Sequence, residues 1–203
     1  MIFGFDPGGK SGVALLSKGK NGGLVGEVAT VHSVEEAFAW VCHRSATNLR
    51  AAGIDTLISW SVMPKGWRPM DVYLRKTYPE IAKSVVASNG LYGSMGIQGM
   101  AMALLLRKRC PKVTLNETHP KVQYFAEAKC RYQFSRSMIE WLQQRISWTR
   151  FPEILTDDEW DALFSAVITH QALSSQCRTD LIEKTQAKGS LLFPAGKCHY
   201  FWL

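Results

Sequence analysis

Three short apolar segments joined by tight glycine turns begin this chain, and they constrain its fold more than any other feature. The segments cover Ile2–Asp6, residues 12–17 and Leu24–Val31, with Pro7-Gly8-Gly9 in the first turn. Apolar runs of this length between glycine-rich turns predict β-strands, and strands joined this closely form an antiparallel meander. A dinucleotide-binding βαβ arrangement is excluded, because it needs helices between its first strands.

The rest of the chain alternates predicted helices and strands. A helix begins at Ser33, with Glu36 as its capping-box partner, and is expected to end at Gly53. The other expected elements are parallel strands over residues 55–60 and 112–117, helices over residues 68–78, 96–109, 135–148 and 157–173, and an irregular segment or edge strand over residues 191–203. This order predicts a single α/β domain over residues 1–203, with a mixed five-stranded sheet (an antiparallel hairpin plus parallel strands) flanked by helices.

Two of the expected strands end in a carboxylate. Asp6 ends the first strand and Glu117 ends the strand over residues 112–117. The carboxyl ends of parallel strands share the edge of the sheet where α/β proteins bind ligands. A carboxylate ending an apolar strand also costs desolvation energy unless it meets a cation or hydrogen-bond donors. The alternative interpretations are that Asp6 only caps its turn and that Glu117 is a solvated strand end.

Acidic residues also begin the helix expected over residues 157–173. Asp157 and Asp158 lie in its first turn, where acids suit the helix dipole, so a purely structural role stays open for them. Asp161 lies one turn further in and shares a face with both. We favour Asp158 and Asp161 as metal ligands, with Asp157 as a third candidate.

Carboxylates gathered from separate elements predict a divalent metal site. The predicted catalytic residues are Asp6, Glu117, Asp158 and Asp161, and Asp157 is added as a metal ligand. Such oxygen ligands hold Mg²⁺ or Mn²⁺, and a pair of ions ~4 Å apart neutralises charge and activates water in phosphodiester hydrolysis. Without a cation the same carboxylates would repel each other. We therefore expect Mg²⁺ or Mn²⁺ as cofactor, as two ions.

The charge balance favours a polyanionic partner. The formal net charge is +7, which attracts nucleic acid at long range. Candidate nucleic-acid-binding residues are Lys10, Lys65, Trp67, Arg68 and Arg75, although a salt-bridged, solvated helix face explains the last two about as well.

The remaining sequence features concern His119 and the compartment. His119 is a candidate general base, against the slightly favoured alternative of a locally bonded histidine at a strand end. No uncharged apolar stretch is long enough for a membrane helix, and five scattered cysteines suggest reduced thiols in the cytoplasm.

Several segments resemble a known family. IFGFDPGGKSGVAL at residues 2–15 is similar to the first strand and hairpin of RuvC-like resolvases and other RNase-H-like nucleases, in which the aspartate binds metal. A closer resemblance is to an uncharacterised bacterial family of predicted RNase-H-like nucleases, through RPMDVYLR at residues 68–75, ETHP at 117–120 and DDEWDAL at 157–163. The resemblance implies a ribonuclease-H-like fold, a divalent metal and nuclease activity on DNA or RNA. Likeness to resolvases adds the expectation of a homodimer.

One departure from the family pattern leaves two other functions open. Family members carry an acid at the end of the strand after the first helix, where the segment LISWS of this chain offers Ser59 and Ser61. This favours, as an alternative, a catalytically weakened nucleic-acid-binding protein with the same fold. DPGGKSG also resembles the phosphate loop of actin-like and sugar-kinase phosphotransferases, but those need two such domains and rank last.

Overall fold

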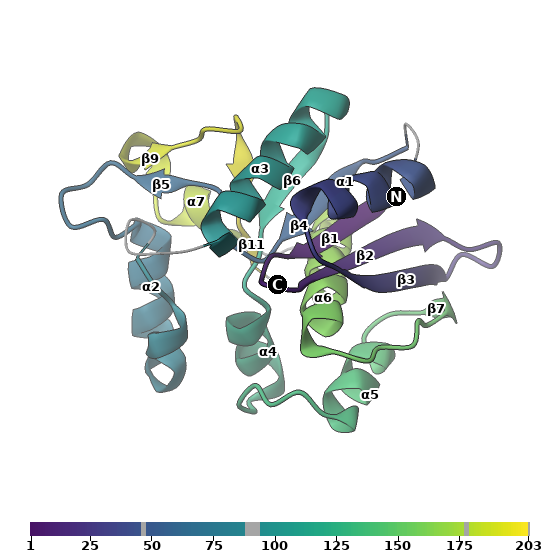
Figure 1. Cartoon of the computed structure of the whole chain (residues 1–203). Coiled ribbons are helices and arrows are strands. Elements are labelled where there is room, and N and C mark those ends of the chain that lie inside the picture. Colours follow the sequence, from purple (N-terminus) through teal and green to yellow (C-terminus); the bar gives the residue numbers. More distant parts are fainter. Residues whose placement is uncertain (46–47, 88–93, 177–178, 203) are drawn as a thin grey trace.

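A seven-stranded sheet forms the centre of the molecule in the computed structural model, which describes residues 1–45, 48–87, 94–176 and 179–202. The strand order is β10-β6-β4-β1-β2-β3-β7 (Figure 1). The bounds are β1 Ile2–Asp6, β2 Ser11–Lys18, β3 Leu24–Val31, β4 Ala51–Ile54, β6 Thr114–Glu117, β7 Trp148–Arg150 and β10 Cys198–His199.

The strand directions make the sheet mixed. Strands β1, β2 and β3 pair antiparallel, which confirms the predicted meander. Strands β4, β6 and β10 continue the sheet from β1 in parallel, and β7 pairs parallel to β3. The expected number of five strands was wrong, because the short strands β7 and β10 extend the sheet at its two edges.

Helices cover both faces of the sheet. Their bounds are α1 Val34–Ser45, α2 Pro69–Thr77, α3 Ser94–Arg109, α4 Pro120–Ala128, α5 Arg136–Gln144, α6 Asp157–Gln171 and α7 Leu181–Lys184. Two small strand pairs lie outside the main sheet: β5 Trp60–Ser61 with β9 Leu191–Leu192, and β8 Thr179–Asp180 with β11 Phe201–Trp202. None of the helices in these described ranges is both long and apolar enough to cross a membrane.

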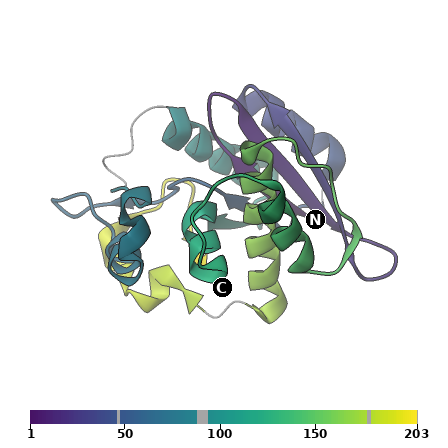
Figure 2. The same cartoon turned by 90° about the horizontal axis from the view of Figure 1, so that it is seen from below.

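The side chains of β1 point alternately into two hydrophobic cores, one on each face of the sheet. Phe3 and Phe5 face the core shared with α1 and α3, whereas Ile2 faces the core built around α6. Helices α4, α5 and α6 lie on that second face, as both views of the ribbon show (Figure 1, Figure 2). Because side chains alternate along a strand, Asp6 belongs to the same face as Ile2 and points toward α6.

Helix α6 lies unusually close to the sheet. A Cβ on Gly4 of β1 would sit 1.9 Å from the Ala162 carbonyl oxygen, and one on Gly12 of β2 1.8 Å from that of Asp158. Gly53 of β4 meets the Ser165 carbonyl oxygen in the same way, at 2.3 Å. Three neighbouring strands thus present bare backbone where α6 crosses them, and this brings the acidic start of α6 to the end of β1.

The structure corrects the elements around β4. Helix α1 ends at Ser45 instead of Gly53, and the strand that follows it is Ala51–Ile54 instead of residues 55–60. Asp55 therefore follows directly after the parallel strand next to β1. The helix expected over residues 135–148 was also too long, because α5 ends at Gln144 and Trp148 begins β7. Of the expected tail, residue 203 lies outside the described residues, and β10 supplies the edge strand.

Candidate functional site

Three carboxylates from three elements meet at one edge of the sheet. Asp6 ends β1, Asp55 follows β4 and Asp161 lies in α6, and each offers an oxygen within 4.8 Å of the other two. Asp6 and Asp161 are buried, at 7% and 3% exposure, whereas Asp55 keeps partial contact with solvent. This cluster, the Asp6–Asp55–Asp161 triad, could hold a metal ion.

The electrostatics of the triad are compatible with the binding of a cation. Burial raises the pKa of Asp6 and of Asp161 well above the ordinary value, and the Asp55 carboxylate raises both further. Burial also raises the pKa of Asp55, to about 7. The Oδ1 atom of Asp161 is buried without a hydrogen-bond partner among the described residues. Three hard oxygen ligands with an unsatisfied atom among them fit a divalent cation such as Mg²⁺ or Mn²⁺.

Other predicted acids lie at the rim of this triad. Asp158 is half-buried and close enough for its charge to raise the pKa of Asp6, while Asp157 is exposed. Thr156 caps α6 by accepting a hydrogen bond from the Glu159 N–H. The structure thus brings Asp158 near Asp6, while the exposed Asp157 is close enough to Asp161 for its charge to raise the pKa of that carboxyl.

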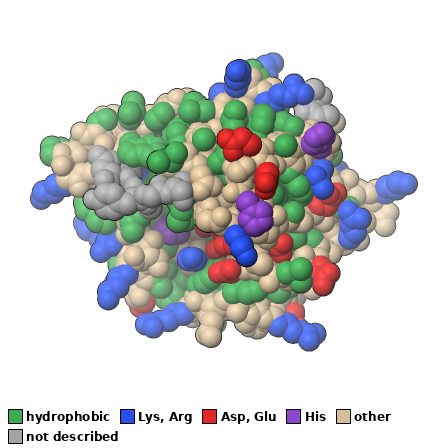
Figure 3. Space-filling view, viewed as in Figure 1, with side chains coloured by type: hydrophobic (Ala, Val, Ile, Leu, Met, Phe, Trp, Pro, Cys, Tyr) green, Lys and Arg blue, Asp and Glu red, His purple; other side chains and the backbone are tan. Residues whose placement is uncertain are grey.

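Lysine side chains neighbour these acids. Burial alone would lower the pKa of Lys121, but the carboxylates of Asp161, Asp55 and Asp6 raise it above its ordinary value. Burial raises the pKa of Asp158, and the exposed Lys10 lies near enough to oppose part of that rise. On the face drawn in Figure 3, acidic side chains gather toward the middle, and most Lys and Arg side chains lie around them.

Glu117 lies in a different, fully buried network. Arg68 places Nη2 2.6 Å from Glu117 Oε1 and donates from Nη1 to Oε2 at 2.8 Å. The same guanidinium binds both carboxylate oxygens of Asp71 at 2.7 Å. Its Nη1 also donates to Ser59 Oγ at 2.8 Å, and the Ile58 N–H donates to Glu117. Arg68 is 0% exposed, so its charge serves this network and is not presented at the surface.

The pleat of the sheet explains why Glu117 and the triad separate. Glu117 pairs in register with Ile54, whose side chain faces the core on the α1 and α3 side. Its neighbours Asn116 and Thr118 point the other way and hydrogen-bond to Thr169 and Ser165 of α6. An acid at the end of a strand reaches the triad only if its side chain points to the α6 face of the sheet. Because side chains alternate along a strand, Asn116 and Thr118 point to that face and Glu117 points to the opposite one.

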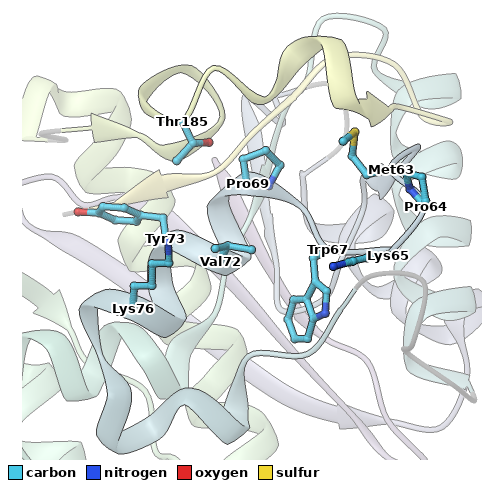
Figure 4. Close-up of a pocket in the computed structure, with 9 residues that line it drawn as sticks. All are labelled: Met63, Pro64, Lys65, Trp67, Pro69, Val72, Tyr73, Lys76 and Thr185. Carbon is cyan, nitrogen blue, oxygen red and sulfur yellow. The ribbon is translucent and has the colours of Figure 1, made fainter.

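A second predicted group lines a surface pocket of about 740 Å³ against α2 (Figure 4). Lys65 and Trp67 enter from the loop before α2, and Tyr73 and Lys76 from the helix itself. Arg75 stacks its guanidinium over the Trp67 ring at 4.9 Å and donates to the Val85 carbonyl at 2.8 Å. The structure therefore gathers Lys65, Trp67 and Arg75, but it separates them from Arg68.

His119 lines a pocket beside the triad, together with Asp55 and Lys121. Burial lowers the pKa of His119 to about 4, so its imidazole is neutral near pH 7. The sequence-based reasoning missed Asp55, because the strand before it was misplaced. It also missed Lys121, since a lone lysine on an unpredicted helix carries no signal in the sequence.

Comparisons with known proteins assign no family to this chain. No family model matches it, and neither curated proteins nor solved structures give a match.

Proposed function

We propose that this protein is a nuclease that hydrolyses phosphodiester bonds of DNA or RNA with Mg²⁺ or Mn²⁺ held by Asp6, Asp55 and Asp161. The observation that carries the proposal is the triad itself: three carboxylates from separate elements within 4.8 Å, one with a buried, unpartnered oxygen. Such a cluster destabilises a metal-free protein, since each buried charge opposes the others. Binding of a catalytic cation would explain why the protein keeps this cluster despite its cost in stability.

The topology supports a ribonuclease-H-like fold for this proposal. An antiparallel β1–β2–β3 meander continues into the parallel strands β4 and β6, with α6 packed across the first strand. The acids lie at the carboxyl end of the central strand β1, after its neighbour β4, and on α6. This agrees with the resemblance of residues 2–15 to nucleases in which the aspartate at the end of the first strand binds metal.

The residues of the site have distinct tasks in this reaction. A divalent ion bound there supplies Lewis-acid activation of the phosphate and of water. Asp6, Asp55 and Asp161 would hold and orient it, and Asp158, whose charge acts on Asp6, is a further carboxylate for a second ion. The neutral imidazole of His119, in the pocket that begins at Asp55, can accept a proton from the attacking water.

Basic residues next to the triad support a nucleic-acid substrate. Lys83, Lys121 and Arg131 line a pocket of about 520 Å³ together with Tyr132, and Lys121 also borders the pocket that contains Asp55. Cations in this place can position phosphates on either side of the scissile one. The net charge of +7 adds long-range attraction for the same partner.

The position of Asp55 favours the nuclease over the alternative of a catalytically weakened binding protein. That alternative rested on serines where the family carries an acid, and that comparison used the wrong strand bounds. With β4 ending at Ile54, Asp55 stands directly after the strand that follows the first helix.

Cleavage and metal binding test the proposal together. Labelled single-stranded, duplex and branched DNA and RNA are incubated with the protein in Mn²⁺ or in EDTA, and Mn²⁺ binding is measured by calorimetry. Asp6→Asn and Asp161→Asn should each lower cleavage by about a hundredfold or more and weaken Mn²⁺ binding, because each removes a charged ligand.

The matched control is Glu140→Gln, which removes one carboxylate from the exposed Arg136–Glu140 pair on α5. It should cleave and bind Mn²⁺ as the unchanged protein does. Absence of cleavage on every substrate, with nucleic-acid binding equal in all four proteins, would contradict the nuclease and leave a binding protein.

A further inference from the structure

A second pocket opens directly beside the triad. It has a volume of about 340 Å³, and its wall begins at Asp55 and continues through Thr56 and Leu57. The segment around Val85 and the start of α3 at Met95 form the opposite walls. This volume is at the lower end of the range of small-molecule sites, enough for one nucleoside-sized group.

The walls combine apolar surface with a few polar groups. Leu57, Val85, Val86 and Met95 supply the apolar part, and Val86 and Met95 are 41% and 39% exposed at the rim. Mostly apolar walls with a few placed polar groups are typical of sites that hold a planar heterocycle.

One polar group in the wall has no partner. The hydroxyl of Thr56 is buried, Thr56 is 7% exposed, and its Oγ1 makes no hydrogen bond within the described part of the chain. Its Cγ2 methyl packs against α3, where a Cβ on Gly99 would lie only 1.9 Å away. The neighbouring hydroxyl of Thr118 is satisfied by Ser165. Since a buried hydroxyl without a partner costs free energy, we take the Thr56 hydroxyl as a candidate hydrogen-bond partner for a ligand.

Lys121 connects the pocket to the triad. It lines the pocket, and its charge acts on Asp6, Asp55 and Asp161. An ammonium in this position can hold a phosphate that lies between the metal and the pocket.

We propose that this pocket binds the base and sugar of an unpaired nucleotide next to the scissile phosphate, with Thr56 bonding the base and Lys121 the phosphate. The inference rests on the proposed nuclease function and deepens it by naming the substrate class. A pocket of about 340 Å³ holds one nucleoside-sized group, so a base that enters it is not paired. The substrate is therefore single-stranded at this position, or the nucleotide is turned out of a duplex.

Two duplexes test the inference, one fully paired and one with a single unpaired 2-aminopurine nucleotide. Binding is measured by anisotropy in Ca²⁺, which takes the same oxygen ligands, and 2-aminopurine emission is recorded in parallel. Extruding a paired base costs a few kcal/mol, so we expect the unpaired duplex to bind about tenfold tighter or more. Its emission should rise, because none of the described residues that line the pocket has a tryptophan, tyrosine or phenylalanine ring to stack on it.

Two variants assign the effect to the pocket. Val86→Trp fills the rim and should abolish both the preference and the change in emission. Thr56→Val keeps the shape but removes the hydroxyl, and should lower the preference by about fivefold. Leu104→Trp is the control, since Leu104 is 47% exposed on α3 and lines none of the pockets described here; it should behave as the unchanged protein.

The outcomes separate the inference from the function. Cleavage of both duplexes is assayed in Mn²⁺ with the same proteins. Equal affinity for the two duplexes, or a preference that survives Val86→Trp, overturns the pocket assignment while Mn²⁺-dependent cleavage keeps the nuclease. Failure to bind either duplex also overturns the pocket assignment, whereas the nuclease is overturned only when single-stranded and branched substrates are not cleaved either.

Discussion

Asp55 and Glu117 occupy similar places after neighbouring parallel strands, but their surroundings are opposite. Asp55 faces two other carboxylates, whereas Glu117 is held by the Arg68 guanidinium at 2.6 Å. Asp55 has the Lys121 ammonium in its surroundings but shares it with Asp6 and Asp161, whereas Glu117 is bound directly by a guanidinium. For a single carboxylate, this difference decides whether it is a candidate ligand or part of the scaffold.

The raised pKa of Asp55 predicts how metal-free stability depends on pH. A carboxyl whose pKa rises from 3.8 unfolded to about 7 folded stabilises the folded state below pH 3.8, and this contribution is lost as pH rises to about 7. Asp55→Asn has no carboxyl to ionise at this position, so it does not lose this stability as pH rises. In EDTA, the melting temperature of Asp55→Asn minus that of the unchanged protein should grow as pH rises from 4 to 7.

Saturating Mn²⁺ should reverse the order at pH 7, because only the unchanged protein keeps all three carboxylates. If the difference in melting temperature between the variant and the unchanged protein in EDTA stays constant from pH 4 to 7, burial does not raise the pKa of Asp55.

The buried Arg68 network predicts a large stability effect. Arg68→Met leaves the carboxylates of Asp71 and Glu117 buried without a cation, and should lower the free energy of unfolding by about 3–5 kcal/mol. Arg136→Met breaks only the exposed pair with Glu140 on α5, and should cost under about 0.5 kcal/mol. Urea unfolding measures both. Similar losses in the two variants would mean that the network contributes little.

At the scale of elements, the approach of α6 to the sheet sets the geometry of the triad. Gly12→Ala would place a Cβ 1.8 Å from the Asp158 carbonyl oxygen and push the acidic end of α6 away. We expect the free energy of unfolding to fall by about 1–3 kcal/mol and Mn²⁺ affinity to fall about tenfold or more.

Gly189→Ala is the matched control, because a Cβ at Gly189 meets no atom within 4 Å. Chemical denaturation and calorimetry read both effects. Unchanged Mn²⁺ affinity in Gly12→Ala would show that the triad does not depend on this contact.

The elements with strong local signals could be predicted from the sequence. The β1–β2–β3 meander, α2 and α3 follow from apolar periodicity and turns, and the start of α6 from Thr156 and its acids. Asp6, Asp158 and Asp161 were candidates for the same reason. Strand β4 could not be predicted, because its residues Ala51–Ile54 read AAGI and have weak strand propensity.

Tertiary packing explains that failure. Gly53 must be small because the Ser165 carbonyl of α6 lies against it, so close packing selects against the bulky residues that mark a strand. Residues 55–59 form a connection instead, in which Ile58 is 1% exposed and donates its N–H to Glu117, and Trp60 begins the short strand β5. One misplaced strand was enough to hide Asp55.

For the whole molecule, the net charge of +7 predicts salt-dependent binding of nucleic acid. Each phosphate neutralised by a lysine adds a counterion to those released, so Lys83→Ala should reduce the slope of log affinity against log salt by about 1. Lys83 lines the pocket that it shares with Lys121, whereas Lys20 lies on the β2–β3 turn at the other end of the molecule (Figure 1, Figure 2). Lys20→Ala should leave the slope unchanged. Equal slopes in the two variants would place the nucleic acid elsewhere.

The order of β1, β4 and α6 along the chain determines when the triad can form during synthesis. Strands β1 and β4 can pair soon after they leave the ribosome, but Asp161 arrives only with α6, which lies far behind β4 in the sequence. Contacts between such distant segments form late in folding, because a long loop must close first. The triad is therefore incomplete until α6 packs against β1, so a metal ion held by all three carboxylates would bind only after that step.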